Sequence, residues 1–179
     1  FVLALLTLCS CSASPEVQKR RYLESGNAYF KAGKFQEAAI QFRNAVQIDP
    51  KLVEAHLQLA QAYLAMKNQD TALQEFKEAA TLDPKNRDTQ LQVAVLLIGQ
   101  GAYAEAQSRL EGILALNPAD AQAHALLGQR FVAAEEIPKA IEELKKAIEL
   151  DRSRLEPYTV LAAVYLGAGR PAEAEAVIS

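Results

Sequence analysis

An interval of 34 residues recurs along this chain and constrains its fold more than any other feature. Pro50, Pro84 and Pro118 lie 34 residues apart, and each follows an aspartate or an asparagine. Alanine recurs at the same interval, at positions 38, 72, 106, 140 and 174. A fixed period of this length is typical of a stack of helical hairpins. We therefore expect an all-α protein built of antiparallel helix pairs, each of which packs only on its neighbours.

The period also sets the expected domain organisation. From Lys19 onwards it divides the chain into units 19–52, 53–86, 87–120 and 121–154, with a truncated fifth unit at 155–179. Each unit holds two helical patterns joined by a tight turn. Gly33, Gly101 and Gly169 lie at this turn, where a residue with positive φ ends the first helix. Lys67 and Glu135 replace the glycine in the second and fourth units, so we expect those turns to be strained or differently shaped.

The residues at fixed places in each unit resemble the tetratricopeptide repeat family. Its pattern of an aromatic, Leu-Gly, Tyr, Ala, Phe, Ala and Pro falls in the first unit on Tyr22, Ser25, Gly26, Tyr29, Ala38, Phe42, Ala45 and Pro50, where Ser25 departs from the pattern by replacing the leucine. The second unit matches it with His56, Leu59, Ala60, Tyr63, Ala72, Phe76, Ala79 and Pro84. Gln90, Ile113 and Arg152 depart from the pattern in later units. The resemblance implies a right-handed superhelical solenoid of four full repeats plus a truncated fifth.

The resemblance also implies a binding surface, because the first helices of this family line a concave groove that holds a partner segment. The inward positions are Leu23, Asn27, Phe30, Leu57, Gln58, Gln61, Leu64, Leu91, Gln92, Val95, Ile98, Leu126, Gln129 and Val132. These side chains are apolar or carry uncharged amides, which favours an apolar or amphipathic protein segment. One branch of the family clamps C-terminal carboxylates with cations, but Leu23, Asp88 and Gln92 occupy those places here. Further repeats or self-association are the alternative cover for this face.

No group of residues predicts catalysis, a metal site, a cofactor or a small-molecule substrate. His56 and His124 share one repeat position, so their recurrence follows from the architecture and we interpret both as structural. Phosphate-cradling glycine loops, nucleophile elbows and HExxH helices do not occur. The formal net charge of −3 argues against nucleic acid as a partner, since phosphate binding needs clustered positive charge.

The first residues predict a route to a membrane. Residues 1–10, FVLALLTLCS, are too short to span a bilayer and fit the apolar core of a secretory signal. The run Leu8-Cys9-Ser10-Cys11 resembles a bacterial lipobox, with Cys11 as the lipidated residue and 11–18 as a short tether that enters the first helix. The alternative is an ordinary cleaved signal with two incidental cysteines. Ser12 after the modified cysteine resembles residues that permit transport to the outer membrane. We therefore expect a lipoprotein of the bacterial cell envelope that is anchored at the periplasmic face of the outer membrane.

These observations favour a non-catalytic interaction scaffold of the bacterial envelope. The array resembles lipoproteins of exopolysaccharide and surface-protein export systems. The chain has no initiator Met and stops inside an expected helix, so we expect a piece of a longer protein. The alternative function is therefore the substrate-recruiting arm of a larger enzyme, such as a glycosyltransferase or kinase.

Overall fold

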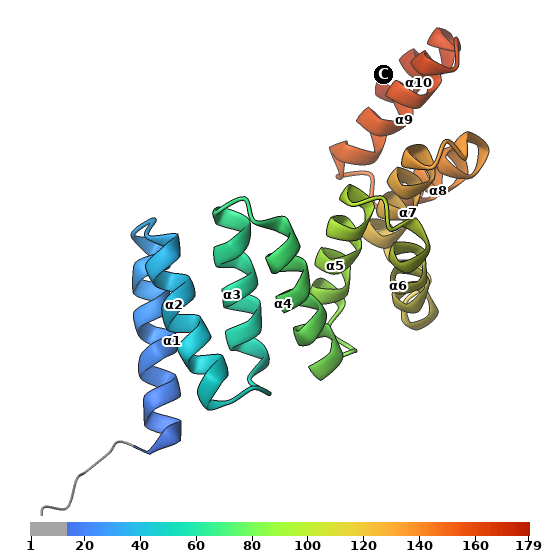
Figure 1. Ribbon diagram of the computed structural model, residues 1–179. Coiled ribbons are helices and arrows are strands. Elements are labelled where there is room, and N and C mark those ends of the chain that lie inside the picture. The colour runs from blue at the N-terminus through green and yellow to red at the C-terminus, as the bar shows by residue number, and fades with distance from the viewer. Residues whose placement is uncertain (1–13) are drawn as a thin grey trace, which may run out of the picture. The chain divides into compact units, whose positions relative to one another are not determined.

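The computed structural model describes residues 14–179, and this part of the chain contains ten helices and no strand. Short turns join successive helices along the chain (Figure 1). Helices α1 to α5 span Pro15–Lys31, Phe35–Ile48, Val53–Ala65, Gln69–Leu82 and Arg87–Gly99. Helices α6 to α10 span Tyr103–Leu116, Ala121–Ala133, Ile137–Leu150, Leu155–Gly167 and Pro171–Ile178. The expected all-α architecture of paired helices is confirmed.

The helices follow the 34-residue period of the sequence. The first helices of successive pairs begin at Val53, Arg87, Ala121 and Leu155, and the second helices keep the same interval from Phe35 onwards. The chain forms two compact units, of which unit 1 ends at Glu75 and unit 2 comprises Phe76–Ser179. Their boundary falls within α4.

The turn inside each helical pair has one conformation throughout the chain. Gly33, Gly101 and Gly169 have φ values of 73°, 75° and 71°, whereas Lys67 and Glu135 have 61° and 60°. Each turn is closed by a backbone hydrogen bond that reaches back five residues, such as Asn68 N–H to Tyr63 O at 2.9 Å and Glu136 N–H to Phe131 O at 2.8 Å. The turns at Lys67 and Glu135 therefore keep the shape of the glycine turns, and these two residues bear the strain of a left-handed backbone.

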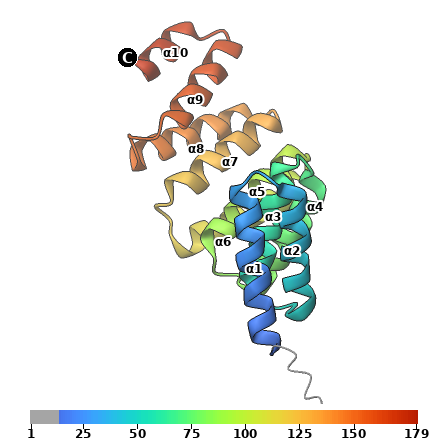
Figure 2. The same ribbon diagram turned by 90° about the vertical axis from the view of Figure 1, so that its left-hand side faces the viewer.

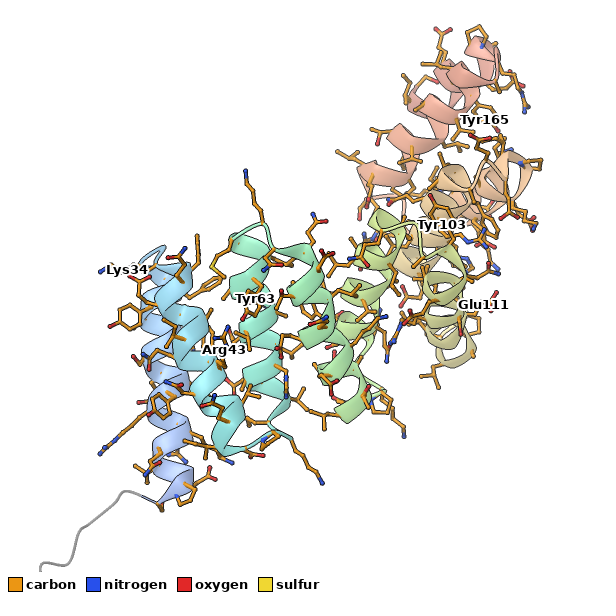
Figure 3. All side chains as sticks on the ribbon, viewed as in Figure 1. Lys34, Arg43, Tyr63, Tyr103, Glu111 and Tyr165 are labelled. Atoms are coloured by element: carbon orange, nitrogen blue, oxygen red, sulfur yellow. The ribbon has the colours of Figure 1, made fainter. Side chains whose placement is uncertain are left out.

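A large side chain placed against a small one sets the helix separation in unit 1. A Cβ added at Gly26 on α1 would lie 2.4 Å from Cε1 of Phe42 on α2, so only glycine fits there. Phe42 is fully buried in a core that also contains Ala38 and Leu59. Arg43 on α2 donates a hydrogen bond to the hydroxyl of Tyr63 on α3. Both side chains are labelled in Figure 3.

Unit 2 repeats this arrangement between α7 and α8, which lie antiparallel in Figure 2. A Cβ on Gly128 of α7 would lie 2.6 Å from Cγ of Leu144 on α8. Leu144 belongs to a core cluster with Leu161, Tyr165 and other residues of α9 and α10. Apolar contacts thus join α8 to the next helical pair, α9 and α10.

The turns between helical pairs depend on a side-chain carboxylate or amide more than on proline. Oδ1 of Asp49 accepts from the backbone N–H of Lys51 at 3.1 Å, and Oδ1 of Asp151 accepts from Ser153 N–H at the same distance. Both are Asx turns, in which a short polar side chain substitutes for a backbone acceptor. Arg152 therefore replaces proline without loss of the turn, and α8 ends at Leu150 as the period requires.

Candidate protein-binding surface

In unit 1 the predicted groove residues lie on α1 and α3 at the edge of the core. Leu23, Phe30 and Leu64 are partly buried and pack against the core cluster around Phe42. The Phe30 ring makes an edge-to-face contact with Phe35, with centroids 5.2 Å apart. The remaining predicted residues of this unit are Asn27, Leu57 and Gln58, which are half-buried, and Gln61, which is exposed.

In unit 2 the predicted groove residues divide between core and surface. Leu91 and Leu126 are only 3% and 6% exposed, and they belong to one core cluster with Leu110 and Leu127. Their side chains therefore hold the helices together. The others leave part of their surface free: Gln92 and Val95 are exposed, and Ile98, Gln129 and Val132 are half-buried.

An apolar hollow of about 550 Å³ lies where α7, the start of α8 and α9 meet. Its lining includes Val132, Ile137, Val160, Ala163, Val164 and Gly167. Ala163 and Gly167 lie four residues apart on one face of α9, so their small side chains leave the space open. Thr159 also lines the hollow, but its hydroxyl donates to the carbonyl oxygen of Glu156 at 2.8 Å. This α7–α9 hollow can accept a large aliphatic or aromatic side chain and offers it no charge.

Of these lining residues, the predicted groove set contained only Val132. The set was not carried into the fifth unit, although one further period leads from Leu126 to Val160 and from Gln129 to Ala163. The signal was therefore present in the sequence. Outside the lining, Nε2 of Gln129 donates to Oε1 of Glu156 at 2.6 Å and connects α7 to α9.

A polar contact that the sequence analysis missed recurs in three repeats. His56 Nδ1 lies 2.7 Å from Oε2 of Glu75, and its Nε2 lies 3.0 Å from the carbonyl oxygen of Pro50. His124 makes the same contacts, at 2.6 Å with Glu143 and at 3.1 Å with Pro118 O.

The third repeat makes the same arrangement with an amide in place of the imidazole and an arginine in place of the glutamate. Gln90 donates to the carbonyl oxygen of Pro84 at 3.2 Å, while its Oε1 accepts from Nη1 of Arg109 at 2.9 Å. In every case the partners lie six residues before and nineteen residues after the central side chain. We call this three-way contact the latch. It supports the structural interpretation of His56 and His124 and explains the departure at Gln90.

The described residues hold no group of three or more side chains suited to bind a metal ion. Within the same range, no helix combines the length and hydrophobicity needed to cross a membrane. Residues 1–10 and Cys11, on which the signal and lipid anchor were predicted, lie outside the described residues.

Two families match most of the repeat region. The family described as "TPR repeat" matches residues 26–67, and that described as "Tetratricopeptide repeat" matches residues 66–129. The chain belongs to the tetratricopeptide repeat family. Proteins of this family are protein-interaction scaffolds, which agrees with a hollow that carries apolar surface and no charge.

Relatives of known sequence or structure are matched over different shares of their own lengths. The DnaJ homolog subfamily C member 3 of Rattus norvegicus is 29% identical over 158 residues, which cover 86% of this chain and 28% of that protein. The chain therefore spans less than a third of that relative's length. MamA residues 41 to the end, from Desulfovibrio magneticus RS-1, superposes with a TM-score of 0.80 at 22% identity, over 90% of this chain and 91% of that one. YrrB, a TPR protein with an unusual peptide-binding site, gives a TM-score of 0.69 at 16% identity, over 87% and 80% of the chains.

Proposed function

We propose that this tetratricopeptide repeat chain is a non-catalytic scaffold that binds an apolar or amphipathic segment of a partner protein along its first helices. The α7–α9 hollow carries the proposal. Its volume of about 550 Å³ falls in the range of ligand pockets, and its lining of valine, isoleucine and small residues suits a buried anchor side chain. The half-buried amides and aliphatic side chains of α7 continue this surface at Gln129 and Val132.

The chemistry of the surface favours an amphipathic helix or an extended apolar strand over an acidic tail. A helix presents anchors at every third or fourth residue and can place one in the hollow. The peptide-binding site named for YrrB shows that a protein of similar fold binds peptides, and it supports the same class of ligand here.

Site-specific photo-crosslinking in the native host tests the scaffold. Ala163 is exposed on α9 and lines the hollow, so it accepts p-benzoyl-phenylalanine without disturbing the core. Ala104 on α6 is also exposed, lies outside this hollow and is the matched control position. We expect a discrete crosslinked protein from position 163 that position 104 does not give. Identical products from both positions, or none from position 163, would contradict the proposal.

We further propose that Cys11 carries a lipid that anchors the scaffold at the periplasmic face of the bacterial outer membrane. The support is the sequence Leu8-Cys9-Ser10-Cys11 after an apolar run, followed by Ser12. Cys11→Ala should release the full-length protein from the membrane fraction and abolish labelling by palmitate. Cys9→Ala is the matched control and should leave both unchanged. An unchanged membrane fraction in Cys11→Ala would remove the anchor from the proposal.

A further inference from the structure

A second hollow, of about 370 Å³, lies in unit 2 beside α6 and the two turns that precede α5 and α7. Ile113 is buried and forms part of its lining, while Leu116 is 75% exposed at its edge. A Cβ added at Gly112 would meet no atom within 4 Å, so this glycine leaves open space above α6. We call this site the α6 hollow. It shares no lining residue with the α7–α9 hollow.

Three changes from the neighbouring repeats occur together in the third repeat beside the α6 hollow. The fourth repeat has Glu142 and Lys146 where the third has Ser108 and Gly112, and the second repeat has Gln74 and Glu78 there. Long side chains are thus absent from this helix face in the third repeat alone among the three.

The third change is in the latch. The second and fourth repeats carry Glu75 and Glu143 as the latch partner, and the third carries Arg109, which lines the hollow. The same substitution set therefore opens an apolar space and places a cation beside it. The change of sign matters because a glutamate here would repel a carboxylate that the arginine attracts.

The rim of the α6 hollow is cationic, although the whole chain carries a formal charge of −3. Lys85, Arg87 and Arg109 line it with a single carboxylate, Asp120. Asp120 is buried and committed to Arg87 and to the N-terminus of α7, where it accepts from Ala123 N–H at 3.0 Å.

The remaining charges near the rim are accounted for by their contacts. Lys85 makes no hydrogen bond or ion pair with the described residues, whereas Arg109 contacts Glu105 at 3.0 Å and Arg87 contacts the exposed Asp88 at 2.8 Å. Glu111, labelled in Figure 3, accepts from Gln107 at 2.6 Å and does not line the hollow. Lys85 is thus the cation most available to a ligand.

From this geometry we infer that the α6 hollow is a second docking site, which takes a large apolar side chain flanked by carboxylates on a segment of a partner protein. The apolar side chain fills the space above Gly112 and covers Leu116. The flanking carboxylates pair with Lys85 and with the outer edge of the Arg109 guanidinium. The site lies on a second helix and on turns between repeats, so it is separate from the first-helix surface proposed above.

An NMR titration of the full chain tests this inference with two blocked peptides, acetyl-Glu-Phe-Glu-amide and acetyl-Lys-Phe-Lys-amide. We expect the acidic peptide to shift the amide signals of Gln90, Gly112 and Leu116, and to bind at least about tenfold more tightly than the basic one. Gly112→Gln fills the hollow without changing the charge. It should lower the affinity for the acidic peptide by a similar factor. It should fold normally, because the new side chain meets open space and glutamine favours helix over glycine.

Two further variants separate the contribution of the cavity from that of the charge. Ala115→Gln alters an exposed neighbour on α6 that does not line the hollow, and it should bind as the parent protein does. Lys85→Glu should weaken the binding of the acidic peptide and strengthen the binding of the basic one. Equal affinity for the two peptides, unchanged binding by Gly112→Gln, or shifts confined to the α7–α9 hollow would each overturn the inference.

Discussion

Lys67 and Glu135 carry the backbone strain of the array, because both have a left-handed conformation that side chains with a Cβ disfavour. The three glycines at equivalent turns adopt the same φ without this cost. The strain is local, since the hydrogen bonds that close the turns are the same in both classes.

Replacing either strained residue with glycine should therefore stabilise the protein. We expect Lys67→Gly and Glu135→Gly each to raise the free energy of unfolding by about 1 kcal/mol. Glycine removes the energetic cost of the left-handed backbone, but part of this gain is offset because it increases the conformational entropy of the unfolded chain. Urea denaturation followed by circular dichroism measures the change. Gly33→Ala is the control and should lower stability by a similar amount. A loss of stability in both glycine variants would show that the side chains of Lys67 and Glu135 contribute more than the turn costs.

Asp120 stabilises the protein in two ways. It pairs with Arg87, and it accepts a hydrogen bond from the backbone at the start of α7. The Arg87 guanidinium holds the pKa of the Asp120 carboxyl below its usual range, and the Ala123 N–H acts in the same direction. A carboxyl with a depressed pKa in the folded protein contributes stability above the unfolded value of about 3.9, and this contribution is lost as the pH falls through the folded value.

Asp120→Asn should remove that contribution while it retains the helix cap, because asparagine caps helices as well as aspartate does. At pH 7 we expect a loss of about 1 kcal/mol, since the Arg87 side chain is 42% exposed and its attraction is screened by solvent. The difference between variant and parent should shrink as the pH falls below about 4. Urea denaturation at pH 7 and pH 3 measures it, and a constant difference at both values would argue against the Arg87 pair as its source.

At the scale of the helical pair, the latch shows what sequence reasoning could and could not predict. The period predicted the helices and the glycine turns. It also showed His56 and His124 at one repeat position. Their partners were missed because each lies on the second helix of the pair, nineteen residues away, and only the folded hairpin brings the two positions together.

The same limitation affected the groove. Leu91 and Leu126 have an apolar side chain at inward positions, as Leu23 does, but the packing of α5, α6 and α7 encloses them. Periodicity assigns a residue to a face of a helix, and the neighbouring side chains decide whether that face is surface or core.

A double-mutant cycle tests whether the Gln–Arg pair of the third repeat can replace the His–Glu pair of the latch. His124→Gln leaves a carboxylate opposite an amide, and Glu143→Arg places a guanidinium against the imidazole. Each should cost about 1–3 kcal/mol, since a buried polar group loses a partner. The double variant recreates the Gln90–Arg109 pair of the third repeat and should recover about 1 kcal/mol or more. The same exchange at His56 and Glu75 repeats the test in unit 1. Strictly additive losses of stability in both units would contradict the idea that one kind of latch pair can replace the other.

At the scale of the whole molecule, the contacts of unit 2 run between chain neighbours and between successive first helices. Stability in such an array is a sum of repeat and interface terms, so a local defect should remain local. Gly128 provides the defect, because a Cβ there would lie 2.6 Å from Leu144 Cγ. Gly112 provides the counterpart on α6, because a Cβ there meets no neighbour.

Gly128→Ala and Gly112→Ala are the same substitution in two helix interiors and should act in opposite directions. We expect Gly128→Ala to cost about 1–3 kcal/mol through overpacking, and Gly112→Ala to gain about 0.5–1 kcal/mol through helix propensity. Native-state hydrogen exchange should locate the Gly128→Ala loss in α7 and α8, with less change in α10. A uniform loss of protection from α5 to α10 would mean that unit 2 opens as one cooperative body. A loss confined to α7 and α8 would show that this helical pair opens without its neighbours, as expected of a stack of repeats.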